Sequence, residues 1–203
     1  MFVILDGVNG SGKTTIIKNL ANKGYDTLSS PNGTPLASFL RPVCRGTDEW
    51  NDVDKTIQFL CFSAARLDEY IRRVHNKKEI IFADRWWTST YVYQVTLQGL
   101  ETRFMEYTIH PQEKIDLVLI LTGDPNVLID RVISERKKNP NHGICSWTKE
   151  KDTMKRLNEI YEKELPLYLT SKNIQWHQIN TTNLSIEEVQ HQVESLTFSK
   201  QVH

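Results

Sequence analysis

The chain has 203 residues, a length typical of one α/β domain with a sizeable buried core. Its 25 Lys and Arg residues equal its 25 Asp and Glu residues, so the charge gives no support to an extended nucleic-acid surface, and nucleic acid is not an expected partner. A small anionic ligand is still compatible with this balance, because it needs only local positive charge.

The cysteines and the hydropathy of the chain exclude further classes of protein. The chain contains three widely spaced cysteines, Cys44, Cys61 and Cys145, and no C-x-x-C pair. This pattern argues against a zinc site and against a disulfide framework. No apolar run approaches the length of a membrane span, so we expect no membrane association. The apolar residues 2–5 lead directly into a glycine-rich motif, which argues against a cleavable signal peptide. We therefore expect a cytoplasmic protein.

Short apolar runs predict strands, and amphipathic spacing predicts helices between them. The expected strands are residues 2–5, 25–28, 79–83, 117–121 and 174–179. The expected helices are residues 15–20, 36–43, 52–76 with Asp52 as a candidate cap, 86–97, a helix that starts at Pro125, 149–171 with a bend at Pro166, and 185–196 with a capping box of Ser185 and Glu188. This alternation predicts one three-layer α/β domain, with a parallel sheet of about five strands and helices on both faces.

Residues 7–14 fit the pattern G-x-x-x-x-G-K-[ST], the phosphate-binding P-loop, between an expected strand and an expected helix. Glycines let backbone N–H groups turn towards a phosphate, and the following helix adds the positive end of its dipole. Lys13 would reach the β- and γ-phosphates of ATP, and the Thr14 hydroxyl would ligate Mg²⁺. The expected ATP-binding residues here are Gly7, Asn9, Gly10, Ser11, Gly12, Lys13, Thr14 and Thr15.

Two further patterns point to the same chemistry. Asp84 and Arg85 follow an expected strand, where a carboxylate can orient Mg²⁺ or its waters and an arginine can clamp a phosphate. Phe62 and Arg66 are four residues apart and share one face of a helix, so the ring could stack on a base while the guanidinium holds a phosphate. Taken alone, Phe62 fits a plain core position better, and Asp84 could simply cap a helix.

Four blocks give the chain a specific resemblance, namely residues 5–15, 31–36, 62–66 and 84–94. The last block reads D-R-x-x-x-S-T-x-x-Y-Q. In this order the blocks resemble the thymidylate kinase family, P-loop enzymes that transfer a phosphoryl group from ATP to a deoxynucleoside monophosphate. Residues 130–138 are similar to the family's basic lid, and residues 185–189 are similar to its final helix. We expect a single kinase domain spanning 1–203, with a lid segment around residues 136–148.

The resemblance implies a role for each matching residue. Phe62 would stack on the acceptor base and Thr90 would bond its edge, while Arg66 and Arg85 would hold the acceptor phosphate. Tyr93 would lie against the sugar near C2′. The complete acceptor set is Asn9, Phe62, Arg66, Arg85, Ser89, Thr90, Tyr93 and Gln94.

The same resemblance implies a donor side and a homodimer. Lys13, Arg85 and Arg136 would be the catalytic cations, and Thr14 with Asp84 would form the metal site. Arg131, Arg136 and Lys137 would close over ATP, although a solvated, charged helix end explains these three equally well. The homodimer would pack through helices such as the one expected at 52–76.

The chain also departs from the family pattern. Asn9 stands where the family usually has an acidic residue, Ser29, Ser30 and Asn32 replace charged residues near Pro31, and Trp86 and Trp87 are unusually bulky. These departures bear on the acceptor. The leading hypothesis is a kinase of dTMP or a related 5-substituted pyrimidine deoxynucleotide. The alternatives are a deoxynucleoside kinase with Asp6 as base, a kinase acting on a modified base or an end in DNA, and a P-loop ATPase or switch protein.

Overall fold

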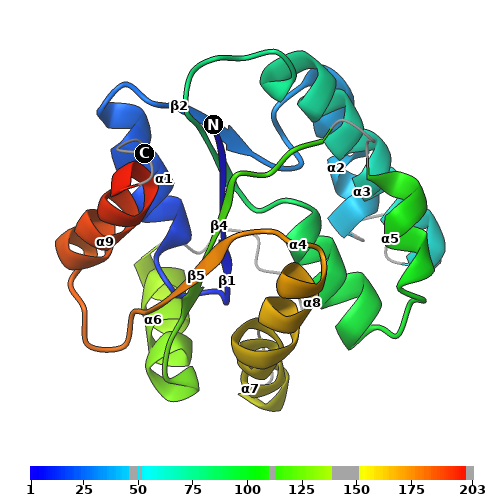
Figure 1. The fold of residues 1–203 in the computed structure, drawn as a ribbon. Helices are drawn as coiled ribbons and strands as arrows, with labels where there is room; N and C mark the ends of the chain where they lie inside the picture. The colour runs from blue at the N-terminus through cyan, green and yellow to red at the C-terminus, as the bar shows by residue number, and fades with distance from the viewer. Residues whose placement is uncertain (46–49, 51, 110–112, 139–150, 200–203) are drawn as a thin grey trace.

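Five parallel strands form the centre of the protein in the computed structural model (Figure 1). The structure describes the whole chain except residues 46–49, 51, 110–112, 139–150 and 200–203, together with the side chains of Arg45, Tyr107 and Arg136. The strands are β1 (Phe2–Gly7), β2 (Asp26–Ser29), β3 (Ile81–Asp84), β4 (Leu117–Thr122) and β5 (Trp176–Asn180). Each starts or ends within two residues of its expected position.

The strands are ordered β2-β3-β1-β4-β5, so the strand before the P-loop is central. Leu5 of β1 pairs with Asp84 of β3, and Gly7 pairs with Leu121 of β4. All carboxyl ends therefore meet at one edge of the sheet, the edge at which open α/β sheets bind their ligands. The expected parallel, three-layer α/β fold is confirmed.

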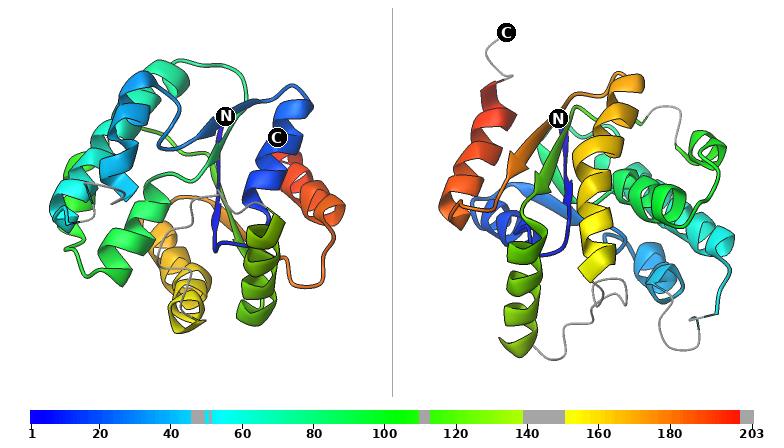
Figure 2. Two further views of the ribbon diagram at one scale, coloured as in Figure 1. Left: turned by 180° about the vertical axis from the view of Figure 1, so that it is seen from behind. Right: turned by 90° about the horizontal axis from the view of Figure 1, so that it is seen from below.

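Alternate residues of the strands enter two separate hydrophobic cores, as a two-residue period requires. Val3 and Leu5 belong to the core that α1 and α9 cover. Ile4 and Val118 belong to a larger core, which is covered by the helices between α3 and α8. Figures 1 and 2 show these helical layers on opposite sides of the strands.

Helical segments make up most of the remaining chain. They are α1 (Lys13–Asn22), α2 (Pro35–Arg45), α3 (Lys55–Glu69), η2 (Tyr70–Val74), α4 (Trp87–Thr90), η3 (Tyr91–Leu97), α5 (Arg103–Thr108), α6 (Pro125–Lys138), α7 (Lys151–Glu159), η5 (Ile160–Glu164), α8 (Leu165–Ser171) and α9 (Ile186–Phe198). The three segments labelled η are π-helical.

Three details of the helices differ from expectation. The long helix begins after Asp54, not Asp52, because the Asp54 side chain accepts a hydrogen bond from the backbone N–H of Thr56. It continues beyond Glu69 as a π-helical turn. Helix α5 was not expected, since it is short and its sequence has no clear 3.6-residue period. The capping box of Ser185 and Glu188 at the start of α9 is confirmed.

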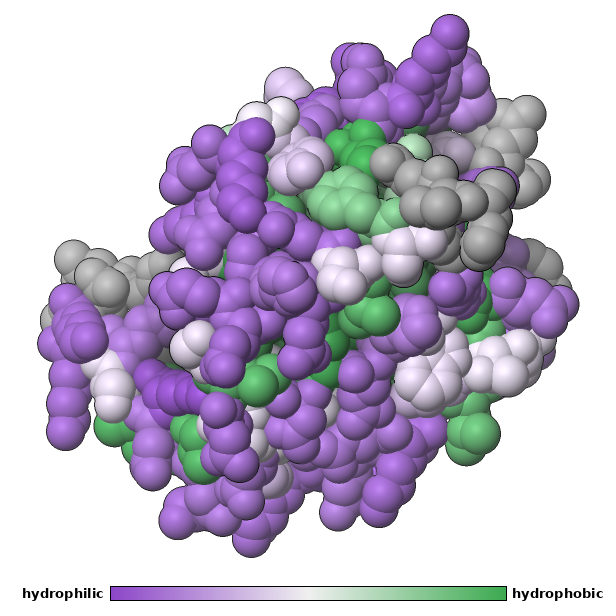
Figure 3. All heavy atoms as spheres, turned by 60° about the vertical axis from the view of Figure 1, so that its left-hand side comes forward, coloured by the Kyte–Doolittle hydropathy of each residue, from purple (hydrophilic) through white to green (hydrophobic). Residues whose placement is uncertain are grey.

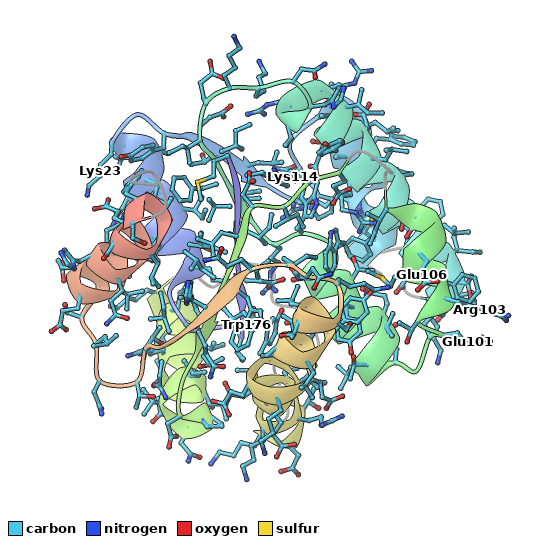
Figure 4. All side chains as sticks on the ribbon, in the orientation of Figure 1. Lys23, Glu101, Arg103, Glu106, Lys114 and Trp176 are labelled. Atoms are coloured by element: carbon cyan, nitrogen blue, oxygen red, sulfur yellow. The ribbon has the colours of Figure 1, made fainter. Side chains whose placement is uncertain are left out.

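The surface is mostly polar where it covers α1 and α9, as Figure 3 shows for the side that lies to the left in Figure 1. Charged side chains such as Lys23, Glu101 and Arg103 point outwards at the periphery (Figure 4). Pairs like Arg103 with Glu101, both largely exposed, contribute little to stability. Among the described residues, the helices fall short of the length and apolar character that a membrane crossing needs.

Candidate active site

The P-loop runs from the end of β1 to the start of α1 and depends on its glycines. Gly7, Gly10 and Gly12 all have positive φ, at 144°, 84° and 95°. A Cβ on Gly7 would lie 2.0 Å from the Leu121 carbonyl oxygen, so no other residue fits against β4. Gly12 caps α1 in the left-handed conformation, which directs the positive end of that helix towards the loop.

Lys13 is the first residue of α1, and its side chain folds back into the loop. Its Nζ donates to the Val8 carbonyl oxygen at 2.7 Å and to Ser11 Oγ at 3.3 Å. Burial, reinforced by the nearby charge of Arg85, lowers the pKa of Lys13 from 10.5 to about 7. An anion placed in the loop would restore the ordinary preference for the charged amine.

Thr14 and Asp84 form a pair beside the P-loop. Thr14 Oγ1, at the start of α1, donates to Asp84 Oδ2, at the end of β3, at 3.3 Å. The other carboxylate oxygen, Asp84 Oδ1, is buried and has no hydrogen-bond partner in the described part of the chain. A buried oxygen without a donor, next to a hydroxyl and a phosphate loop, fits a hard cation such as Mg²⁺.

Asp6 lies at the end of β1, fully buried beneath the loop. Its Oδ1 accepts from the backbone N–H of Gly7 and from the Tyr161 hydroxyl, both at 2.8 Å, and from Arg85 at 3.3 Å. Its Oδ2 accepts from the hydroxyls of Thr88 and Ser89. A buried carboxylate is tolerated only when such donors and a cation surround it. Asp6 therefore holds Arg85, Ser89 and Tyr161 in place through hydrogen bonds made beneath the P-loop.

Arg85 connects the P-loop with the α4–η3 segment. Its backbone adopts a positive φ of 69°, and its Nη2 donates to Asn9 Oδ1 at 2.6 Å. Its guanidinium also lies 5.7 Å from the centre of the Tyr93 ring, in cation–π geometry. A non-glycine residue in the left-handed region costs free energy and is held there by its surroundings, which is common at functional positions.

Arg66 projects from α3, and only 2% of its surface is exposed. Its two Nη atoms make long hydrogen bonds of 3.4 Å, to Thr90 Oγ1 and to the Thr108 carbonyl oxygen. Its Nε is buried without a partner among the residues that the structure describes. Burial lowers the pKa of Arg66, although the guanidinium still stays charged at neutral pH. A buried cation with spare donors is suited to a polar ligand.

One cleft of about 950 Å³ joins the P-loop, the Thr14–Asp84 pair, Arg85 and Arg66, while Asp6 lies buried outside its lining. Of the expected site residues, it is lined by Asn9, Gly10, Ser11, Gly12, Lys13, Thr14, Thr15, Phe62, Arg66, Asp84, Arg85, Ser89, Thr90, Tyr93, Gln94 and Arg131. Gly7 lies outside the lining, because it packs against β4. Phe62 reaches the cleft, and the core position on this helix is Phe59, which is fully buried.

The lid residues are only partly described. Arg131 lines the cleft, and its guanidinium donates to the carbonyl oxygens of Thr181 and Thr182 at 2.9 and 3.1 Å, which ties α6 to the loop after β5. Lys137 is exposed on the last turn of α6. The side chain of Arg136 and most of the expected lid lie outside the described residues.

Sequence reasoning missed two buried residues that contact residues of this site from outside the cleft. Tyr161 lies in the π-helical segment η5, where a 3.6-residue period no longer shows which side chains point inwards. Glu69 ends α3 and bonds the loop after β2 rather than solvent. Its only sequence signal is an acidic residue on the apolar side of an amphipathic helix, three residues after Arg66.

The cleft is too extended for one set of phosphates. The lining runs from the P-loop past Arg85 to a ring, Phe62, and to a second arginine, Arg66, which is buried. On a parallel sheet with this strand order, such a two-part cleft defines a P-loop nucleotide kinase, a phosphotransferase that brings two nucleotides together.

Comparison with known proteins identifies the family. Residues 5–193 match the family model described as thymidylate kinase. A thymidylate kinase of Acholeplasma laidlawii is 33% identical over 153 residues, covering 70% of this chain and 73% of that protein. Another, from Shouchella clausii, is 27% identical over 181 residues, 81% of either protein. The chain therefore belongs to the thymidylate kinase family and is a nucleoside monophosphate kinase.

A solved structure supports the fold independently. The crystal structure of thymidylate kinase from Ehrlichia chaffeensis matches with a TM-score of 0.68 over 97% of this chain and 98% of that chain, at 19% identity. The resemblance seen in the sequence is thus confirmed for the family, the fold and the reaction class. Neither the DNA-directed kinase nor the switch-protein alternative is favoured by these relatives.

Proposed function

We propose that the protein transfers the γ-phosphoryl group of ATP to dTMP or a related 5-substituted pyrimidine deoxynucleotide. The observation that carries this proposal is that the P-loop and the Phe62–Arg66–Thr90 group line the same cleft. The relatives are named thymidylate kinases, which agrees with this choice of acceptor.

The donor would bind in the P-loop. Lys13 would leave the Val8 carbonyl oxygen and bond the β- and γ-phosphates, regaining its full charge. Thr14 and Asp84 would hold Mg²⁺, which neutralises phosphate charge when it is bound. Arg131 is already oriented by Thr181 and Thr182 at the edge of the cleft, where the purine would lie.

The acceptor would bind with its phosphate near Arg85. Asn9 accepts a hydrogen bond from this arginine, so its amide N–H₂ group is left to donate into the cleft. Arg66, expected at the acceptor phosphate, donates a long hydrogen bond to Thr90, the residue expected at the base edge, so it would lie close to the base as well. Phe62 would stack on the ring, with Ser89, Tyr93 and Gln94 completing the pocket.

The proposed chemistry needs no general base. An acceptor phosphate has a second pKa of about 6 and is already ionised at neutral pH, so one of its oxygens attacks the γ-phosphorus while ADP leaves with the bridging electrons. The deoxynucleoside kinase alternative would require a carboxylate base. Asp6, its candidate, accepts bonds from four side chains and is fully buried, so it cannot reach a substrate hydroxyl.

A coupled ADP assay with Mg²⁺-ATP and a panel of deoxynucleoside monophosphates, deoxynucleosides and duplex DNA tests this proposal. We expect dTMP or a 5-substituted analogue to give the fastest turnover. The variant Arg66→Ala should lose at least about a hundredfold in kcat/KM for the acceptor, since it removes a buried charged donor. Its ATP affinity should stay within about twofold. Arg103→Ala, on the exposed surface, is the matched control. Stimulation by deoxynucleosides alone would refute the proposal.

We further propose that the protein acts as a homodimer. Most large hydrophobic residues exposed in the described part of the chain lie on α2, α3 and their flanks, and Phe39 is 78% exposed. Other members are Leu36, Trp50, Ile57, Leu60 and Ile71. Helices α2 and α3 pack against each other, and exposed apolar residues that gather on neighbouring elements often mark an interface. Phe39→Asp should give a monomer in sedimentation velocity, whereas Leu167→Asp, on α8, should not.

Two expectations stay predictions. The lid at about residues 136–148, within a single kinase domain spanning 1–203, falls mostly on residues that the structure does not describe. A cytoplasmic location agrees with the proposed substrates and could be checked by fractionating cells that express the protein.

A further inference from the structure

Glu69, the last residue of α3, is fully buried, yet its carboxylate neither lines the cleft nor takes part in the chemistry described above. Within the described part of the chain, its three hydrogen-bond donors come from one loop, the residues that follow β2. Ser30 Oγ donates to Oε2 at 2.6 Å, and the backbone N–H groups of Asn32 and Gly33 donate to Oε1 at 2.8 and 2.6 Å. Bonds to an ionised acceptor are among the strongest in proteins.

The same loop forms part of the cleft. Ser30, Pro31 and Asn32 line it together with Phe62 and Arg66. The loop is therefore a wall of the acceptor pocket, and Glu69 holds it from behind.

The contacts around the loop come from several elements, and α3 supplies the carboxylate among them. A Cβ on Gly33 would lie 2.0 Å from Leu28 Cδ1 and 3.1 Å from Glu69 Oε1, so glycine allows the backbone to approach the carboxylate. The loop carbonyls are held separately, with Arg41 donating to Pro31 O at 2.9 Å and Arg73 to Gly33 O at 3.2 Å. Glu69 binds the backbone N–H groups of Asn32 and Gly33, whereas the Ser30 N–H donates to the Asp84 carbonyl oxygen at 3.2 Å.

One helix consequently serves both sides of the pocket. Phe62 and Arg66 project from α3 into the cleft, and Glu69, three residues after Arg66, projects to the loop. The distance between the stacking ring and the opposite loop is then fixed by a single rigid element. Helices hold such geometry better than free loops do.

We propose that Glu69 is a positioning residue for the acceptor: its carboxylate fixes residues 30–33 as a wall of the pocket without touching the nucleotide. This inference rests on the proposed nucleotide kinase function. It predicts that loss of the carboxylate weakens acceptor binding more than ATP binding. The reason is that the hydrogen bonds described for Glu69 go to residues 30–33 and not to the P-loop.

The experiment compares Glu69→Gln with wild type in KM for dTMP, KM for ATP, kcat and Tm. The amide keeps the shape but presents an N–H₂ group to donors, so the loop loses part of its anchor. We expect KM for dTMP to rise about tenfold, while KM for ATP changes by less than about twofold. Glu194→Gln, the same chemical change on α9 next to Lys23, is the matched control and should alter neither KM.

A second arm separates positioning from general stability. Ser30→Ala removes one donor, and a double-mutant cycle with Glu69→Gln should show that the two effects on KM for dTMP are not additive. Additive effects, an unchanged KM for dTMP, or equal rises in both KM values would overturn the proposal. If Glu69→Gln does not fold, Ser30→Ala alone tests the proposal. An unchanged KM for dTMP in Ser30→Ala would then overturn the role proposed for Glu69.

The wild-type measurement keeps the two proposals apart. A wild-type enzyme that rejects dTMP but accepts another monophosphate would refute the proposed acceptor, and the Glu69 comparison would then be made with that monophosphate. A wild-type enzyme that accepts no monophosphate would overturn both. Normal wild-type activity with an unaffected Glu69→Gln variant would overturn only the role of Glu69.

Discussion

The lowered pKa of Lys13 predicts that ATP binding takes up a proton at alkaline pH. In the free protein, burial and the charge of Arg85 bring this pKa to about 7, so above pH 7 the amine is mostly neutral. Bound phosphates favour the charged amine and should return the pKa towards 10.5, its ordinary value. Between these two values, binding must therefore bring a proton with it.

The expected loss of ATP affinity at alkaline pH follows from the lowered pKa of Lys13. At pH 9 only about 1% of Lys13 is protonated in the free protein, so the affinity for ATP should be about a hundredfold weaker than at pH 6.5, or about 3 kcal/mol at about 1.4 kcal/mol per pKa unit. The phosphates of ATP add little above pH 7, because they are already ionised.

Isothermal titration calorimetry with Mg²⁺-ATP, in buffers of different ionisation enthalpy, measures both quantities. We expect proton uptake close to zero at pH 6 and close to one per ATP at pH 9. Lys13→Arg is the control, because arginine stays charged throughout, and it should bind ATP with little pH dependence whatever its absolute affinity. Absence of proton uptake at pH 9, or equal pH dependence in Lys13→Arg, would refute the reasoning.

Three further changes have expected outcomes. Asp84→Asn should weaken the response to Mg²⁺ and lower kcat about a hundredfold, measured by Mg²⁺ titration at saturating ATP, because the buried oxygen near Thr14 loses its charge. Asp6→Asn should lower the free energy of unfolding by about 2–3 kcal/mol in urea titration, since an amide leaves buried donors unpaired. Gly33→Ala should lower Tm by several degrees and raise KM for the acceptor, because its Cβ would overlap Leu28, and an unchanged Tm would contradict the packing described.

The sequence predicted the sheet correctly, and the P-loop residues that it singled out from Asn9 to Thr15 line one cleft. Buried strands such as β4 are continuous apolar runs, and the P-loop has fixed residue types at fixed spacing, so both can be recognised without a structure. The asparagine at position 9 was also identified as unusual, and its contact with Arg85 now explains how an amide is accommodated there.

The remaining parts of the site depend on contacts between distant segments. Tyr161 meets Asp6 across 155 positions, through a π-helical segment that breaks the helical period. Glu69 meets residues 30–33 only because α3 passes behind that loop. Arg66 was placed with the acceptor, but its proximity to Thr90 could not be inferred from spacing alone. Long-range hydrogen bonds of this kind leave no local pattern.

The convergence of bonds on Asp6 has a consequence for how this protein can change through mutation. Arg85, Ser89 and Tyr161, from two separate segments, share one acceptor in a buried space. A substitution at any of these three residues changes how many hydrogen bonds the others must make to the Asp6 carboxylate, so their mutational effects should be strongly epistatic. A pairwise mutational scan should show these positions tolerating change together and resisting it singly. Mutations that change which nucleotide accepts the phosphoryl group should therefore be tolerated more easily in the pocket walls than among the residues bonded to Asp6.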